Sequence, residues 1–379
     1  RLTLNGMNAN KIEVNSGTWT IVLQGNNTLM GQDAGISIAY TANSVVFDGD
    51  GNLTMKGTDS GLIIGRKISL TMQGTGKIEA ISTKKNVPGS GGLYIDNNGH
   101  LTIKNGTINI SGGDYGLSAG SNTSIDVLGG QVTTTGATNA YRQNRYSTLN
   151  IMGGSVTCNG MVEEVNGDNK IEINGSGSKL TVNGDILASE SSSKVILKSG
   201  ELQLNQGNLS GKGTLEKEGG FLTGTGSLAD DKKLDLTINE NQTIDKKLTI
   251  GTSVDPKRYF NIPTECGALS YAVSEENAGG RAHLDENNKL VADSVGIIKL
   301  KVTSASTNFY RSAEKEIELT VEKGTLTGVS VEPYSGTYDG SEHDAVEVRV
   351  NGERPSTDMT IKYAKVENGV AGNFGEMMP

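Results

Sequence analysis

Apolar residues recur along the first two thirds of the chain as pairs separated by one polar residue, each pair followed by a Gly-rich turn. This alternation is typical of β-strands, and no long stretch places apolar residues at helical spacing. The steps between the first members of successive pairs are 24, 25, 31, 24, 24, 22 and 24 residues. The first members are Ile21, Val45, Leu70, Leu101, Ile125, Leu149, Ile171 and Val195. The pattern predicts an all-β chain built on an internal repeat.

Each repeat has room for three strands. A second apolar position follows each pair, and a short run such as Gly35-Ile36-Ser37-Ile38 or Gly61-Leu62-Ile63-Ile64 closes several units. Three strands in about 24 residues predict one rung of a parallel β-helix, in which equivalent strands stack about 4.8 Å apart. Alternation then places two apolar residues inside the coil and one polar residue outside. We expect a right-handed coil, because parallel connections strongly favour that hand.

The sequences GHLTIKNGTINISGGDYGLSAG and STLNIMGGSVTCNG lie within this repeat. They resemble the β-helical carbohydrate-binding-type domains of bacterial surface proteins, and the resemblance covers residues 1–228. It implies an extracellular protein, secreted or on the bacterial cell surface. The partner it implies is a polysaccharide or another glycan.

The last third of the chain has a different pattern. After Gly226 the Gly turns stop, and longer alternating strands predict an Ig-like β-sandwich over residues 229–323. This region resembles bacterial Ig-like repeats, in which an Asn-Tyr motif precedes the last strand; here the motif reads Asn308-Phe309-Tyr310. Residues 324–379 resemble part of a filamin-like MBG repeat, whose YDG signature is Tyr338-Asp339-Gly340. The resemblance implies that both are spacer modules.

Composition and charge narrow the classes of partner that the chain can bind. The net charge of -9 and the pI of about 5.1 argue against nucleic acid, because no basic stripe is available to neutralise phosphates. No apolar run is long enough for a membrane helix, and Arg1 opens in mid-pattern, as in a trimmed mature fragment. Cys158 and Cys266 fall in different expected domains, so we expect no disulfide between them. We expect a monomer whose partners are a glycan and, as an alternative, host or cell-envelope proteins.

Catalytic chemistry finds little support in the sequence. The three histidines lie in three different expected domains, and none has a neighbouring nucleophile in sequence. Glycosidases need clustered carboxylates at a fixed separation. The pair Glu163-Glu164 is instead expected to point to opposite faces of a strand. The sequence therefore favours a non-catalytic protein, with a structural or adhesin stalk, and a polysaccharide lyase or glycosidase, as the alternatives.

Two Asp-rich turns raise the question of calcium. In FDGDGNL, Asp48, Asp50 and Asn52 alternate, but Gln73, Thr75 and Lys77 occupy the same turn one repeat later, so this turn forms without acids. The better candidates are the corner residues Asp33, Asp59 and Asp114. Stacked carboxylates repel unless a cation or hydrogen bonds compensate, so a shared Ca²⁺ is one interpretation. A solvated corner that caps a Gly turn is the other.

Aromatic and basic residues suggest where a glycan would bind. The candidates cluster in one part of the coil: Tyr94, Tyr115, Tyr141, Arg142, Arg145 and Tyr146. Three of these tyrosines fall near the third strand of successive rungs, which predicts an outward row of rings. Such a row would stack on sugars, and the arginines would favour acidic ones. The alternative is that tyrosines cover a sheet because they have high β propensity.

Overall fold

The computed structural model describes residues 1–84, 91–274 and 279–324. Beyond them it describes 328–333, 335–337, 340, 346–350, 362, 364, 366–367 and 369–373. The chain forms two compact units. The first comprises Arg1–Leu236, Thr264–Ala268 and Ser304–Ala313. The second comprises Thr237–Pro263, Leu269–Thr303 and Glu314–Pro379.

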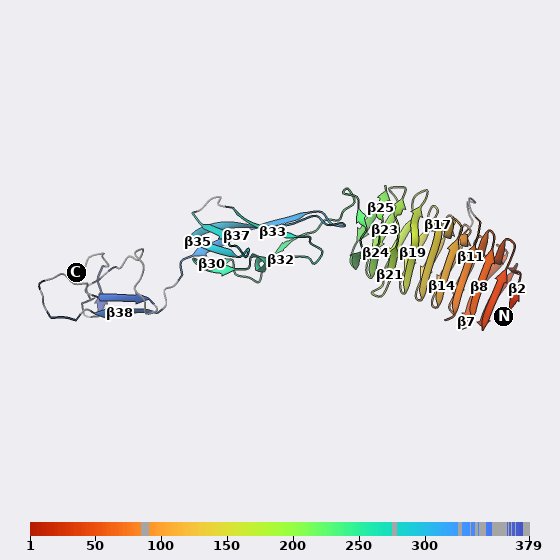
Figure 1. Cartoon of the computed structure of the whole chain (residues 1–379), viewed down its shortest axis with the longest axis horizontal. Helices are drawn as coiled ribbons and strands as arrows, with labels where there is room; N and C mark the ends of the chain where they lie inside the picture. Colours follow the sequence, from red (N-terminus) through yellow and green to blue (C-terminus); the bar gives the residue numbers. More distant parts are fainter. Residues whose placement is uncertain are drawn as a thin grey trace. The chain divides into compact units, whose positions relative to one another are not determined.

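The first unit is a parallel β-helix of about nine turns with about 24 residues per rung, which confirms the predicted all-β class and the predicted β-helix. Figure 1 shows its strands stacked as successive rungs. The first face is a 10-stranded parallel sheet. Its strands, in order, are β1 (Leu2–Asn5), β4 (Gly17–Gln24), β7 (Ala42–Gly49), β10 (Ser69–Met72), β13 (His100–Ile103), β16 (Ser124–Val127), β18 (Thr148–Ile151), β20 (Lys170–Ile173), β23 (Lys194–Leu197) and β26 (Thr214–Lys217).

The other two faces merge at the middle of the coil, because β17 (Gln131–Gln143) and β19 (Ser155–Glu164) run through both. The remaining strands of the second face are β2 (Asn8–Ala9), β5 (Asn26–Met30), β8 (Asn52–Gly57), β11 (Lys77–Ser82), β14 (Thr107–Gly112), β21 (Lys179–Val182), β24 (Glu201–Leu204) and β27 (Phe221–Thr223). Those of the third face are β3 (Ile12–Val14), β6 (Ala34–Ile38), β9 (Ser60–Ile64), β12 (Gly91–Ile95), β15 (Tyr115–Ala119), β22 (Ile186–Ala188), β25 (Asn208–Gly211) and β28 (Ser227–Leu228).

The register confirms the predicted apolar rows in all but the first rung. Val45 stacks on Leu70, and the row continues in register to Val195. In the first rung the prediction is wrong by two residues, because Ile21 stacks on Phe47 and Trp19 on Val45. Trp19, Ile21 and Leu23 alternate, so the sequence offers two equivalent apolar pairs there. The interior rows are buried, which supplies the hydrophobic core of the coil.

The FDGDGNL stretch forms a corner, as predicted. β7 ends at Gly49 and β8 begins at Asn52. The Asp48 carboxylate accepts hydrogen bonds from the Gly49 amide at 2.8 Å and from Gln73 Nε2 at 3.1 Å. Asn52 Nδ2 donates to Asn26 Oδ1 of the preceding rung at 2.8 Å. These side chains therefore link stacked turns.

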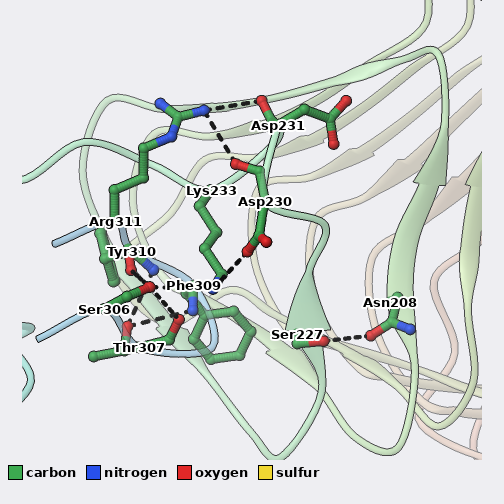
Figure 2. Close-up of polar contacts among 10 residues, drawn as sticks. All are labelled: Asn208, Ser227, Asp230, Asp231, Lys233, Ser306, Thr307, Phe309, Tyr310 and Arg311. Carbon is green, nitrogen blue, oxygen red and sulfur yellow. Dashed lines mark hydrogen bonds and ion pairs between the residues drawn. The ribbon is translucent and has the colours of Figure 1, made fainter.

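A segment from much later in the sequence closes the last rung. Residues 304–313 were expected inside the Ig-like module, yet they pack in the first unit. Phe309 and Tyr310 join its hydrophobic core, and the Leu234 amide donates to the Phe309 carbonyl at 2.9 Å. Arg311 donates to the Asp231 carbonyl at 2.9 Å and to Asp235 Oδ1 at 2.8 Å. Figure 2 shows part of these contacts. We call residues 304–313 the end cap.

The second unit contains several small sheets. A four-stranded sheet has the order β30 (Lys247–Thr249), β37 (Ala313–Glu322), β36 (Gly296–Ser304) and β33 (Leu269–Ser274). A three-stranded sheet has the order β31 (Ser253–Val254), β35 (Leu290–Ser294) and β34 (Arg281–Leu284), with antiparallel pairing. β29 (Asn239–Glu240) pairs with β32 (Phe260–Asn261), which follows the 3₁₀-helix η1 (Pro256–Tyr259).

Two antiparallel strand pairs follow: β38 (Val329–Pro333) with β39 (Val346–Val350), and β40 (Val366–Glu367) with β41 (Val370–Ala371). Tyr338 and Asp339 of the YDG signature lie outside the described residues. Across the described ranges, no helix combines the length and the apolar character needed to cross a membrane.

Candidate functional site

The corners between the third and first faces form a shallow polar groove of about 620 Å³ on the β-helix. Its lining comes from the turns after β15, β17, β19 and β22, which stack because the rungs stack. We call it the corner groove, and it is lined by Ser121, Asn144, Arg145, Asn166, Gly167, Asp168, Glu190, Ser191 and Ser192. Amide, hydroxyl, carboxylate and guanidinium groups thus gather in one hollow, which is the chemistry used to hydrogen-bond sugar hydroxyls.

The turn at the centre of the groove has an unusual backbone. Asn166, Gly167 and Asp168 have φ angles of 63°, 77° and 55°, so three consecutive residues are left-handed. This conformation is unfavourable for residues other than Gly, and Asn and Asp tolerate it best. Bonds between rungs hold the turn. Asn166 Nδ2 donates to Asn144 Oδ1 at 2.7 Å, and the Asp168 amide donates to Ser192 Oγ at 2.9 Å.

Charges in the groove are balanced by opposite charges. Arg145 Nε lies 3.7 Å from Asp168 Oδ2, and the Arg145 guanidinium stacks 4.7 Å above the Tyr146 ring. Glu190 is paired with Lys212 at 3.5 Å. Tyr146 is 49% exposed, which leaves ring surface beside the groove. The pairing removes the surplus positive charge that would favour acidic sugars.

The structure divides the predicted tyrosine row. Tyr141 is only 1% exposed and stacks between Leu117 and Val162 inside the coil, so its predicted outward position is wrong. Its alignment with Leu117 was the available signal, because both occupy the first inward position of the third strand. Tyr94 is half-buried and pairs in register with Ser118, which is buried. Burial, and next the Asp96 carboxylate, raise the pKa of the Tyr94 hydroxyl.

Tyr115 and Arg142 contact each other on the third face. The Arg142 guanidinium lies 5.5 Å from the centre of the Tyr115 ring, and Arg142 Nε lies 3.1 Å from Glu163 Oε2. Asn139 Nδ2 donates to the same carboxylate oxygen at 2.7 Å. Arg142 therefore has a partner of its own, and the predicted set divides into this cluster and the corner groove.

The Asp corners stack as predicted. The amides of Asp59 and Ser60 both donate to the Asp33 carbonyl at 3.0 Å. Lys84 Nζ lies 2.7 Å from Asp59 Oδ1, so a protein cation already compensates this carboxylate. Asp114 also makes an interaction of its own. Among the residues that the structure describes, no group of three or more His, Cys, Asp or Glu side chains is placed to hold a metal ion.

Stacking also brings together polar residues that are distant in sequence. His100 Nε2 lies 2.9 Å from Thr102 Oγ1 and 3.5 Å from Asp126 Oδ2, and Ser124 stacks directly on His100. Ser124 Oγ donates to Asp126 at 3.4 Å. Ser124 thus donates to the carboxylate, and none of these contacts joins its hydroxyl to the His100 ring. The 24-residue step from His100 to Ser124 was the signal for this cluster.

A polar cluster lies inside the coil, next to the turns that line the corner groove. Glu163 and Glu164 do point to opposite faces, and Glu164 is 0% exposed, as are Gln143 and Ser193. Burial raises the pKa of Glu164 to about 8, while the Ser193 hydroxyl acts in the opposite direction. Burial likewise raises the pKa of the Cys158 thiol to about 11 and that of Tyr141 above its ordinary value. The sequence did not reveal this cluster.

A hollow of about 700 Å³ lies in the second unit, lined by residues between Thr237 and Pro263. Its polar groups are used locally. Asp255 Oδ1 accepts from the Lys257 amide at 2.9 Å, and Arg258 stacks on Tyr259 at 5.7 Å. None of the sequence-predicted site residues lines it. The corner groove is therefore the better candidate site, although it is the smaller of the two.

Comparison with known proteins adds no identity to this geometry. The chain matches no family model, and neither the curated proteins nor the solved structures gave a significant match.

Proposed function

We propose that the β-helix binds a neutral, hydroxyl-rich polysaccharide at the corner groove, without breaking a bond. The observation that carries the proposal is a groove of hydrogen-bonding side chains beside an exposed aromatic ring. Asn144, Asn166 and Ser192 offer amide and hydroxyl groups, while Tyr146 offers a face on which a sugar ring can stack. A parallel β-helix is compatible with polysaccharide binding.

The charge pattern sharpens the substrate class. The sequence favoured acidic sugars because two arginines lie close together. Arg142 is paired with Glu163, and Arg145 is paired with Asp168. An acidic polymer would have to displace a carboxylate from each arginine, whereas a neutral glycan can accept and donate around the existing pairs.

We further propose that the protein acts outside a bacterial cell, with the small-sheet modules as Ig-like spacers. This part of the proposal is based on the resemblance of residues 229–323 and 324–379 to surface repeats. A protein partner, as in an adhesin, is the alternative occupant of the same surface.

A binding screen tests the proposal. The chain is titrated with soluble neutral and acidic polysaccharides by isothermal calorimetry or affinity electrophoresis. We expect binding to a neutral polymer and at least about tenfold weaker binding by Tyr146→Ala, corresponding to about 1.4 kcal/mol. Tyr40→Ala is the matched control, since Tyr40 is 75% exposed and does not line the groove. Binding of acidic polymers alone, or equal affinity in both variants, would contradict the proposal.

Hydrolysis at the same groove is a second candidate, because Asp168 and Glu190 both line it. Two carboxylates flanking a bound sugar are the groups that glycosidases use as acid and base or nucleophile. Release of reducing ends from a bound polymer, abolished by both Asp168→Asn and Glu190→Gln, would support hydrolysis. Binding without product would exclude it for that polymer.

A further inference from the structure

The interior of the β-helix contains a carboxyl group that accepts no hydrogen bond of ordinary geometry among the described residues, and the Ser193 hydroxyl is the one group that favours its charged form there. Glu164 is fully buried, and neither of its carboxyl oxygens has a hydrogen-bond partner there. Gln143 Nε2 and Ser193 Oγ, also fully buried, are unpartnered as well. An ionised carboxylate in such a place loses its hydration without compensation, so the neutral acid is the form that fits.

Within the described part of the chain, the surroundings of Glu164 contain no charge that could stabilise its carboxylate. In the register, Gln143 of β17 precedes it and Ala188 of β22 follows it. Ser193, just before β23, lies on its other side. The titratable groups close to this cluster are Tyr141 of β17 and Cys158 of β19, and both are neutral acids near neutral pH. Ionisation of Glu164 would therefore put an unpaired negative charge in the core.

The groove begins next to this residue. Val165 follows Glu164 directly, and the left-handed turn Asn166–Asp168 follows Val165. Asn169, only 1% exposed, ends the turn, and its Nδ2 donates to the Val165 carbonyl at 2.8 Å. A strained turn persists only when its surroundings fix both of its ends. Here the two ends are the buried residues Glu164 and Asn169.

We propose that Glu164 is a pH-sensitive latch beneath the corner groove. Its neutral carboxyl allows the rung to close over the core. Ionisation favours a position in which the carboxylate contacts water. The side chain then leaves the core and the Val165–Asp168 turn is released, which displaces the lining of the groove. The consequence for ligand binding depends on the proposed function, whereas the release of the turn does not.

Cys158 provides a probe of this opening. It is fully buried, shares β19 with Glu164, and becomes the single thiol once Cys266 is replaced by Ser. In the Cys266→Ser protein, alkylation of Cys158 by iodoacetamide is followed from pH 6 to pH 9.5. The matched variant adds Glu164→Gln, which keeps size and shape but cannot ionise. Both proteins share the ordinary rise in thiolate with pH, so their ratio isolates the latch.

We expect the alkylation rate of the Cys266→Ser protein, divided by that of the matched variant, to rise at least about tenfold between pH 6 and pH 9.5. A ratio that is constant over this range would overturn the proposal.

Hydrogen exchange provides a second test on the unaltered chain. The Val165 amide donates to the Gln143 carbonyl and the Asp168 amide to Ser192 Oγ. These two amides, corrected for intrinsic exchange, should lose protection in the same range while those of β8 keep it. Uniform behaviour would also overturn the latch. Neither readout uses a glycan, so a failed binding screen leaves both tests valid.

Discussion

Glu163 and Glu164 are neighbours in sequence, yet the strand sends their carboxyl groups to opposite environments. Glu163 pairs with Arg142 on the surface, where such pairs contribute little to stability. Glu164 is buried without a charged partner among the described residues, and its pKa is raised to about 8 by desolvation. Two glutamates that are adjacent in sequence thus differ in their effect on the pH dependence of stability. Only the burial of the second links the fold to pH.

Stability is expected to fall as pH rises. Because the folded-state pKa of Glu164 lies above the unfolded value of 4.5, the folded state holds the extra proton between about pH 4.5 and about pH 8. The stabilisation is complete below that range and is lost through it, at about 1.4 kcal/mol per pH unit. The total is about 5 kcal/mol, measurable by urea unfolding at a series of pH values. Glu164→Gln should remove this slope, and an equal slope in both proteins would contradict the assignment.

The tyrosines show how far residue roles could be predicted. The sequence predicted outward positions for Tyr94 and Tyr146, and the structure has Tyr94 half-buried and Tyr146 exposed. The prediction failed for Tyr141, because it was grouped with Tyr94 and Tyr115 by its place near the third strand, whereas its register partner is the inward Leu117. The Tyr141 hydroxyl instead donates to Gln143 Oε1 at 2.7 Å inside the coil. A buried partner two residues away cannot be inferred from propensity, since it depends on what the neighbouring rungs leave open.

At the scale of the element, the sequence repeat predicted nearly all strands of the β-helix. Third-strand residues Ile36, Leu62, Leu93 and Leu117 stack in one buried row, each directly after a Gly. The row could be predicted because one side of every strand must be apolar. The corner groove could not, since its residues are polar turn positions whose side chains meet only through stacking.

The glycines before this row are required by a close backbone approach. A Cβ on Gly61 would lie 2.2 Å from the Ile81 amide nitrogen and 2.7 Å from the Ala80 carbonyl carbon. We therefore expect Gly61→Ala to lower the free energy of unfolding by about 3 kcal/mol, an overpacking cost. Gly177→Ala is the control, because no atom lies within 4 Å of a Cβ there. Urea unfolding of both variants measures the difference, and equal midpoints would show that the corner can relax.

At the scale of the whole molecule, the first unit is not a continuous stretch of sequence. The end cap comes from residues 304–313, beyond strands that belong to the second unit. A stack of parallel strands ends in unpaired backbone groups, which invite pairing with another chain unless they are covered. Asn308 and Phe309 carbonyls accept from the Leu228 and Leu234 amides, both at 2.9 Å. Sequence could not predict this closure, because the motif resembles one from sandwich domains.

Weakening the end cap should produce association between copies. Phe309 is 8% exposed, and Phe309→Ala should cost about 3 kcal/mol. We expect sedimentation velocity to show concentration-dependent oligomers for this variant at micromolar concentration. Phe221→Ala, at a position 70% exposed, is the control and should sediment like the unaltered chain. A monomeric Phe309→Ala protein would show that the last rung does not associate with another chain when its cap is weakened.

The end cap also sets an order of events during synthesis. Arg311 donates to Asp235, which lies 76 positions earlier in the chain. At about 5–20 residues per second, the ribosome needs about 4–15 s to make that interval. The early rungs can stack while the last one waits with its edge uncovered. The rate of translation through the second unit therefore determines how long the last rung of each new chain exposes unpaired strand edges that another chain could bind.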